Sequence, residues 1–129
     1  HARQNMITEE HRASVEKYIS GIISGKKSKP LAIYCNPDHC HILIGLHPEV
    51  AISDMARDIK ANSTKWINEN RLTKFRFQWQ AGFGAFTYGR SQLDMVVKYI
   101  RNQPEHHRKK TFREEYLEFL DKFEIKYIN

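Results

Sequence analysis

The sequence predicts an α+β fold, an antiparallel sheet with helices on one face, and two patterns carry that prediction. In three long stretches, apolar residues recur at the three- and four-residue spacing of an amphipathic helix. Between them lie short runs rich in β-branched and aromatic residues, bounded by Gly, Pro and Asn. Helices interleaved with antiparallel strands favour a ferredoxin-like or RRM-like layout. That layout needs a strand before the first helix, and we find no such N-terminal strand pattern here.

The N-terminal half predicts a helix followed by a β-hairpin. An apolar stripe with two glutamates in its first turn indicates a helix over residues 8–24. Residues 31–35 and 39–46 have the composition of strands. The turn sequence Asn36-Pro37-Asp38 joins them. We therefore expect a hairpin over residues 31–46.

The C-terminal half predicts three further helices and two short β segments. A second helix is expected over residues 53–70, and its apolar side includes a tryptophan. Residues 74–80 and 83–88 resemble β segments around a glycine-rich turn. A third helix runs over residues 91–103 and is bounded by a proline. A capping-box pattern begins a fourth helix over residues 111–122.

Length and composition are those of a single domain. The chain has 129 residues, so we expect one domain over residues 1–129 with one core. No apolar run approaches the roughly 20 residues of a membrane span, and no signal-peptide pattern is present. The two cysteines, Cys35 and Cys40, form no spaced framework, which fits a reduced, cytoplasmic protein. They also lack the second ligand pair that a structural zinc site needs.

The charge balance favours a polyanionic partner. The formal net charge is +6, and basic residues cluster in several short stretches. Such a surface suggests nucleic acid first, although a solvated basic surface has the same composition. Residues 75–79 interleave aromatic and polar side chains. This pattern suits base stacking beside phosphates, and it equally suits a half-buried strand.

Two histidines stand at the start of the second predicted strand. His39 and His41 are two apart, so a strand places both on one face, while Cys40 points to the other. Two imidazoles on one face are either a solvent-facing polar surface or a pair of metal ligands. The pair by itself does not decide between these two interpretations.

The third helix carries a tyrosine and a glutamine on one face. Tyr99 and Gln103 are four residues apart, so a hydroxyl nucleophile and an amide oxygen lie about one turn from each other. A tyrosine in an amphipathic helix is usually structural. Together with the histidine pair, however, the two residues form a set suited to metal-assisted chemistry.

This combination resembles the HUH single-tyrosine transposases of insertion sequences, including their REP-associated relatives. The resemblance covers nearly the whole chain. In that family the residue between the two histidines is usually bulky and apolar, whereas Cys40 is smaller, and the family's first strand is missing here. The matching segments are residues 37–44, 59–66 and 79–86, and Tyr99-Ile100-Arg101-Asn102-Gln103 followed by His106-His107.

The resemblance implies a metal-dependent transposase that cleaves and rejoins single-stranded DNA at hairpin-bearing element ends. Tyr99 would be the nucleophile that forms a 5′-phosphotyrosine. A divalent ion, Mg²⁺ or Mn²⁺, would be bound by His39, His41 and Gln103. The implied assembly is a homodimer with active sites formed in trans, associated with the nucleoid through DNA. The residues expected to contact the DNA backbone are Lys60, Lys65, Arg108, Lys109 and Lys110.

An alternative is a non-catalytic module of the same fold that binds single-stranded nucleic acid, such as a domesticated relative. The complete set of His39, His41, Tyr99 and Gln103 favours the enzyme, because a pure binder has no need of these four residues together.

Overall fold

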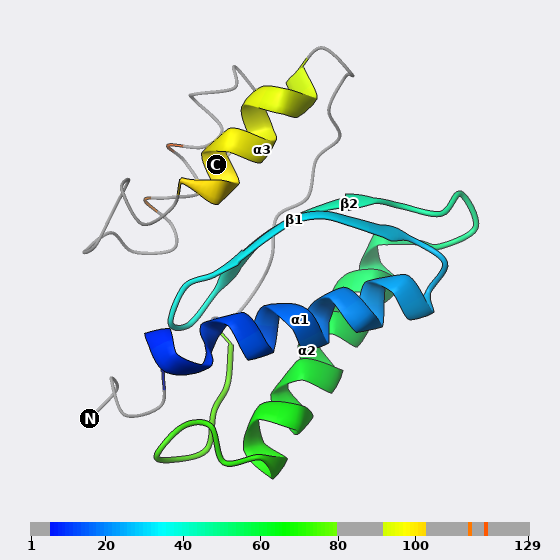
Figure 1. Cartoon of the computed structure of the whole chain (residues 1–129). Helices are drawn as coiled ribbons and strands as arrows, with labels where there is room; N and C mark the ends of the chain where they lie inside the picture. The colour runs from blue at the N-terminus through cyan, green and yellow to red at the C-terminus, as the bar shows by residue number, and fades with distance from the viewer. Residues whose placement is uncertain (1–5, 80–91, 103–113, 115–117, 119–129) are drawn as a thin grey trace.

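The computed structural model describes residues 6–79, 92–102, 114 and 118 of the chain. Within this part, two strands form one antiparallel hairpin and three helices surround it (Figure 1). None of the described helices is both long and apolar enough to span a bilayer. The elements in chain order are α1 (Glu9–Gly25), β1 (Lys29–Cys35), β2 (Cys40–Gly45), α2 (Ile52–Glu69) and α3 (Leu93–Arg101).

The α+β class, the hairpin and the three helices that the sequence predicted are confirmed. The first two helices agree with the predicted bounds within a residue at each end. The third is described over Leu93–Arg101, inside the predicted 91–103. The β segment predicted at 83–88 lies outside the described residues. So does the predicted helix 111–122, apart from two residues of helical backbone.

The two faces of the hairpin pack against different helices. The register pairs Ile33 with Ile42 and Cys35 with Cys40, and these side chains belong to the main core. Because side chains alternate along a strand, the residues between them face the other way. The main core is completed by buried residues of α1 and α2, which both lie on this side (Figure 1): Val15, Ile19, Ile23, Met55, Ile59 and Ile67.

The opposite face of the hairpin is covered by α3, so the prediction of helices on one face only was wrong. Val96, Tyr99 and Ile100 of α3 form a second buried cluster with Ala32 and Leu43. Figure 1 shows α3 on the other side of the strands from α1 and α2. The physical reason is that both faces of this hairpin carry apolar side chains, and a helix with an apolar stripe removes the second set from water.

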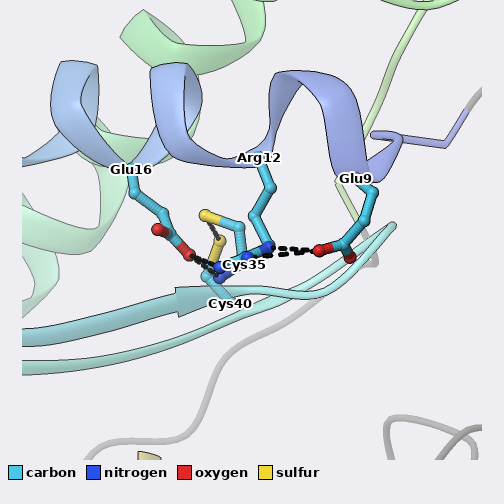
Figure 2. A network of polar contacts seen from close by, with 5 residues as sticks. All are labelled: Glu9, Arg12, Glu16, Cys35 and Cys40. Atoms are coloured by element: carbon cyan, nitrogen blue, oxygen red, sulfur yellow. Dashed lines mark hydrogen bonds and ion pairs between the residues drawn. The ribbon is translucent and has the colours of Figure 1, made fainter. Parts of the chain in front are cut away.

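A polar network joins α1 to the turn end of the hairpin (Figure 2). The Asn36 N–H donates to the His39 carbonyl at 2.7 Å. This makes Asn36 and His39 a hydrogen-bonded pair, so Cys35 and Cys40 form the next, non-hydrogen-bonded pair. The Cys35 N–H therefore points away from β2, and it donates to the Glu16 carboxylate at 2.9 Å. The Glu16 side chain of α1 thus accepts a hydrogen bond from a backbone N–H at the open edge of β1.

The same network surrounds the two thiols. Cys35 and Cys40 are both free, and their Sγ atoms are 2.7 Å apart on the α1 side of the hairpin. Burial raises the pKa of the Cys40 thiol well above its usual range, so this thiol is held protonated. Arg12 bridges the Glu16 and Glu9 carboxylates at 3.3 and 3.2 Å.

The chain after α2 is not a strand, which corrects the predicted β segment at 74–80 over its described residues 74–79. Instead of pairing with a strand, this backbone is bound by one side chain. The Phe77 N–H donates to Asn68 Oδ1 at 2.7 Å, and Asn68 Nδ2 donates to the Phe77 carbonyl at 3.1 Å. Trp79 Nε1 donates to the buried hydroxyl of Ser63 at 2.9 Å. Residues 74–79 are therefore held against α2 by its side chains and are not paired with the described strands.

We expect Glu16→Ala to lower the free energy of unfolding by about 1–3 kcal/mol, because it leaves the Cys35 N–H without its acceptor. Urea denaturation followed by circular dichroism measures this loss. Glu16→Gln retains an acceptor oxygen and should lose less. The matched control is Glu9→Ala, which removes an exposed carboxylate from the same arginine and should cost under about 0.5 kcal/mol. An equal loss in both alanine variants would assign the effect to Arg12 instead.

Candidate active site

The two histidines lie at the turn end of the hairpin, next to each other. His41 belongs to β2, and His39 immediately precedes that strand. Their ring centroids are 5.5 Å apart with the planes nearly perpendicular. His39 is only 7% exposed, and His41 is half-buried. The expectation that the two imidazoles share one face is confirmed, and burial argues against a simple solvent-facing surface.

Asp38 fixes the orientation of the His39 ring. His39 Nδ1 lies 2.9 Å from Asp38 Oδ1. An ionised carboxylate only accepts hydrogen bonds, so Nδ1 carries the hydrogen. In a neutral ring the lone pair is then on Nε2, which is the arrangement commonly found behind metal-binding histidines. Asp38 also belongs to the turn, so one residue shapes the hairpin and orients the imidazole.

Tyr99 is brought to the histidines by α3 of the same chain. The ring centroids of His41 and Tyr99 are 6.4 Å apart in an edge-to-face arrangement. Tyr99 is 3% exposed and belongs to the cluster that docks α3 on the hairpin. The sequence predicted this face to be uncovered and open to such a helix. The structure instead shows α3 already packed there.

Tyr34 is a second phenol beside this site that the sequence analysis did not single out. The strand register places Tyr34 directly opposite His41. The Arg12 guanidinium lies over its ring, 4.7 Å from the centroid. Burial raises the pKa of Tyr34, although the nearby Arg12 charge opposes this. The predicted turn of three residues, 36–38, would set Ile33 opposite His41. The observed turn has only two residues between Asn36 and His39, and this register is what brings Tyr34 to the site.

Several predicted site residues are not brought to this place by the described structure. Gln103 and the basic residues Arg108, Lys109 and Lys110 lie outside the described residues. Lys60 and Lys65 belong to α2, on the other side of the hairpin from His41 (Figure 1). Their role in binding DNA therefore stays a prediction.

Two residues of the segment 59–66, which matches the resembled family, have structural contacts in α2. Ser63 is fully buried and accepts the Trp79 N–H. The Trp66 ring stacks on Tyr18 of α1, with centroids 4.6 Å apart. The interpretation of Trp66 as a packing residue fits this contact.

The two neighbouring imidazoles, His39 and His41, are of the residue type that binds metal ions through nitrogen. Among the described residues, no group of three His, Cys, Asp or Glu side chains is placed to hold an ion. A centre built on His39 and His41 therefore needs a further ligand from outside the described residues, or one of another kind. An amide oxygen such as that of Gln103 is compatible with this requirement, and open positions beyond the protein ligands are typical of catalytic sites.

These features fit a DNA-processing enzyme of the transposase kind, and a comparison with protein families supports this class. The family described as "Transposase IS200 like" matches residues 1–103, and the chain belongs to this family. A search of curated proteins found no match. The family resemblance drawn from the sequence is thereby confirmed, and the roles of individual residues stay predictions.

We expect Asp38→Ala to release the His39 ring from its single tautomer, because Nδ1–H loses its acceptor. Nitrogen-15 NMR of the imidazoles at alkaline pH should show the two His39 ring nitrogens moving toward averaged shifts. Asp38→Asn keeps an acceptor oxygen and should preserve the separation of those shifts. The His47 ring, which accepts a backbone N–H through Nδ1, is the internal control and should not change. Unchanged His39 shifts in Asp38→Ala would show that another group orients the ring.

Proposed function

We propose that this chain is a metal-dependent transposase that cleaves and rejoins single-stranded DNA at hairpin-bearing ends through a 5′-phosphotyrosine. The observation that carries the proposal is the row of rings from His39 through His41 to Tyr99, with centroid separations of 5.5 and 6.4 Å. A phenol beside two imidazoles combines a nucleophile with ligands for an electrophilic ion.

The covalent step is the one that the family resemblance implies for Tyr99. The Tyr99 hydroxyl oxygen attacks the scissile phosphorus, the bond from phosphorus to the 3′-oxygen breaks, and the tyrosine becomes linked to the 5′-phosphate. The phenol proton is lost and the leaving 3′-oxygen gains one, so the step is balanced and needs no external energy source. An ordinary phenol has a pKa of about 10 and is mostly protonated at neutral pH, so the attack requires assistance. Attack by a 3′-hydroxyl on the phosphotyrosine reverses the step and rejoins a strand.

A divalent ion bound by His39, His41 and Gln103 would polarise the scissile phosphate and offset charge in the transition state. Imidazole ligands suit Mn²⁺, whereas Mg²⁺ prefers oxygen ligands, so donor chemistry leaves both ions as candidates. Within the chain, the hydrogen bond from His39 to Asp38 supports such a role because it places the hydrogen on Nδ1 and, in a neutral ring, the lone pair on Nε2.

Single-stranded DNA is the proposed substrate, and the positive charge of the chain supports it. Contacts from basic side chains to phosphates would make binding strongly dependent on salt. The proposed contacts include Lys60 and Lys65 on α2 and the basic run 108–110. Binding of this kind would associate the protein with the nucleoid.

A binding module without chemistry is the second candidate, and the burial of Tyr99 favours it. A nucleophile must reach a phosphate, yet Tyr99 is 3% exposed in this arrangement. The transposase therefore requires α3 to shift on the hairpin when DNA binds. A module that only binds DNA would need no such movement.

The deciding experiment incubates the protein with a labelled single-stranded hairpin oligonucleotide carrying the element's own end sequence and Mn²⁺ or Mg²⁺. We expect a covalent protein–DNA adduct that resists denaturation and disappears in Tyr99→Phe. Tyr34→Phe is the matched control, because it removes the other phenol beside His41 and should leave the adduct in place. Loss of the adduct in Tyr34→Phe alone would reassign the nucleophile. No adduct with either ion would favour the binding module.

The contact between Tyr99 and His41 of one chain supports a site assembled in cis, whereas the family resemblance implied a homodimer with trans sites. We expect an equimolar mixture of Tyr99→Phe and His41→Ala subunits to form no more adduct than either variant alone, because each cis site then carries one lesion. The subunits should be mixed under conditions that allow exchange, with wild-type subunits as the positive control. Recovered cleavage would show trans assembly, since one composite site would then be intact.

A further inference from the structure

The loop after α2 exposes one aromatic ring among three cations. Phe75 is 53% exposed, and Arg71, Lys74 and Arg76 are exposed as well. Phe77, two residues on, is 1% exposed and packs edge-to-face on Trp79 at 4.7 Å between centroids. The structure therefore separates the aromatic pattern of this segment into two rings packed on each other, Phe77 buried and Trp79 half-buried, and one outward ring, Phe75.

The loop is held in place on both sides of Phe75. The Leu72 N–H donates to the Ile67 carbonyl of α2 at 3.1 Å. Downstream, the backbone of Phe77 is bound twice by the Asn68 side chain. At the centre, the Thr73 hydroxyl donates to the Phe75 carbonyl at 2.6 Å. The exposed ring is therefore presented by an anchored backbone, which lowers the conformational entropy lost on binding.

The charges around the ring are of one sign. An isolated exposed phenylalanine is ordinary on a protein surface and needs no explanation. Here residues 70–79 contain no aspartate or glutamate, while they contain three of the chain's 21 lysines and arginines. Within the described part of the chain, those three cations take part in no ion pair. Elsewhere in the described structure, Arg12, Lys26 and Arg57 are paired with carboxylates.

We propose that residues 71–76 form a contact surface for single-stranded nucleic acid, in which Phe75 stacks on an unpaired base and the flanking cations contact phosphates. Every base offers a π-face, so such a surface tolerates many sequences, and cations beside it follow the backbone. The choice of DNA as the nucleic acid rests on the proposed function. The stacking surface itself rests on the exposed ring and its charges.

This surface is separate from the tyrosine site. Figure 1 shows residues 70–79 on the α1–α2 side of the hairpin, whereas α3 lies on the other side. A nucleic-acid strand bound at Phe75 therefore adds binding affinity and positions the substrate, and this contact does not involve His41 or Tyr99. Loss of the Phe75 contact should weaken substrate binding and leave the reaction rate at saturating DNA unchanged.

The test is fluorescence anisotropy with a labelled stem-loop oligonucleotide carrying single-stranded flanks, at fixed salt and without added metal. We expect Phe75→Ala to weaken binding about tenfold, within the range for loss of one base-stacking contact. Phe75→Trp keeps a π-face and should retain affinity. Ile52→Ala, which trims another exposed apolar side chain, is the matched control and should bind like the wild type. Thermal melts verify that each variant is folded.

Two further measurements separate stacking from charge. A blunt duplex without unpaired bases should bind Phe75→Ala and wild type equally, because its bases are already stacked. The double variant Lys74→Ala/Arg76→Ala should reduce the slope of log affinity against log salt by about one to two for the stem-loop. An unchanged affinity of Phe75→Ala for the stem-loop would overturn the proposal. An equal loss for the duplex would also overturn it, because the ring would then not act on unpaired bases.

The outcomes for this surface and for the proposed function are distinguishable. Adduct formation at saturating stem-loop should be unchanged in Phe75→Ala, while the oligonucleotide concentration at half-maximal rate should rise about tenfold. If the wild type forms no adduct but Phe75→Ala still loses affinity, the surface stands and the transposase proposal fails. If the adduct forms and depends on Tyr99 but Phe75→Ala binds normally, the transposase proposal stands and the stacking surface fails.

Discussion

The alternation of side chains along β2 is the constraint on which the rest of the structure depends. Cys40, Ile42 and Ile44 point to the core formed with α1 and α2. His41 and Leu43 point to the face that α3 covers. A slip of one residue in the β1–β2 register would exchange these faces and bury an imidazole among the aliphatic side chains of the main core. The two-residue turn that begins with Pro37 prevents the slip, because it sets which residues are opposite each other.

The described part of the chain contains a sheet of only two strands, and side chains of the helices provide contacts that further strands often provide. A two-stranded hairpin alone is marginally stable in water. Glu16 accepts the outward N–H of Cys35 at the edge of β1. Asn68 binds both the N–H and the carbonyl of Phe77, as a neighbouring strand would. In both cases a helix supplies the hydrogen-bond partner for an extended segment, so helix positions are fixed by polar contacts as well as by apolar packing.

The sequence predicted the parts of this fold that local patterns determine. Period two over residues 39–46 and helical spacing over residues 53–70 gave elements close to those observed. The pattern at residues 74–79 was misleading, because alternating aromatic residues suit a strand and also suit a segment bound by Asn68. The sequence could not predict the position of α3, for a different reason. An apolar stripe shows that a helix is covered, but it does not show which face of a sheet covers it.

The sequence predicted which residue types form the candidate site better than it predicted their arrangement in three dimensions. Spacing alone placed His39 and His41 together, whereas the hydrogen bond from His39 to Asp38 depends on the turn conformation. Tyr34 was missed because the predicted three-residue turn gives a different register, whereas the observed two-residue turn sets Tyr34 against His41. The family relationship supplied what no local pattern could, namely a reason to connect Tyr99 with histidines 58 to 60 residues earlier in the chain.

The burial of Tyr99 connects the stability of the structure with its proposed chemistry. The ring is part of the small cluster that docks α3, together with Val96 and Ile100. Burying one large side chain of this kind contributes about 1.5–3 kcal/mol, so the proposed nucleophile helps to hold its own helix on the hairpin. DNA that draws Tyr99 out must offset that contribution with contacts of its own. The small size of the cluster keeps this cost within the range that a few phosphate and base contacts supply. Under the proposed mechanism, α3 would therefore both cover the histidines and carry the nucleophile.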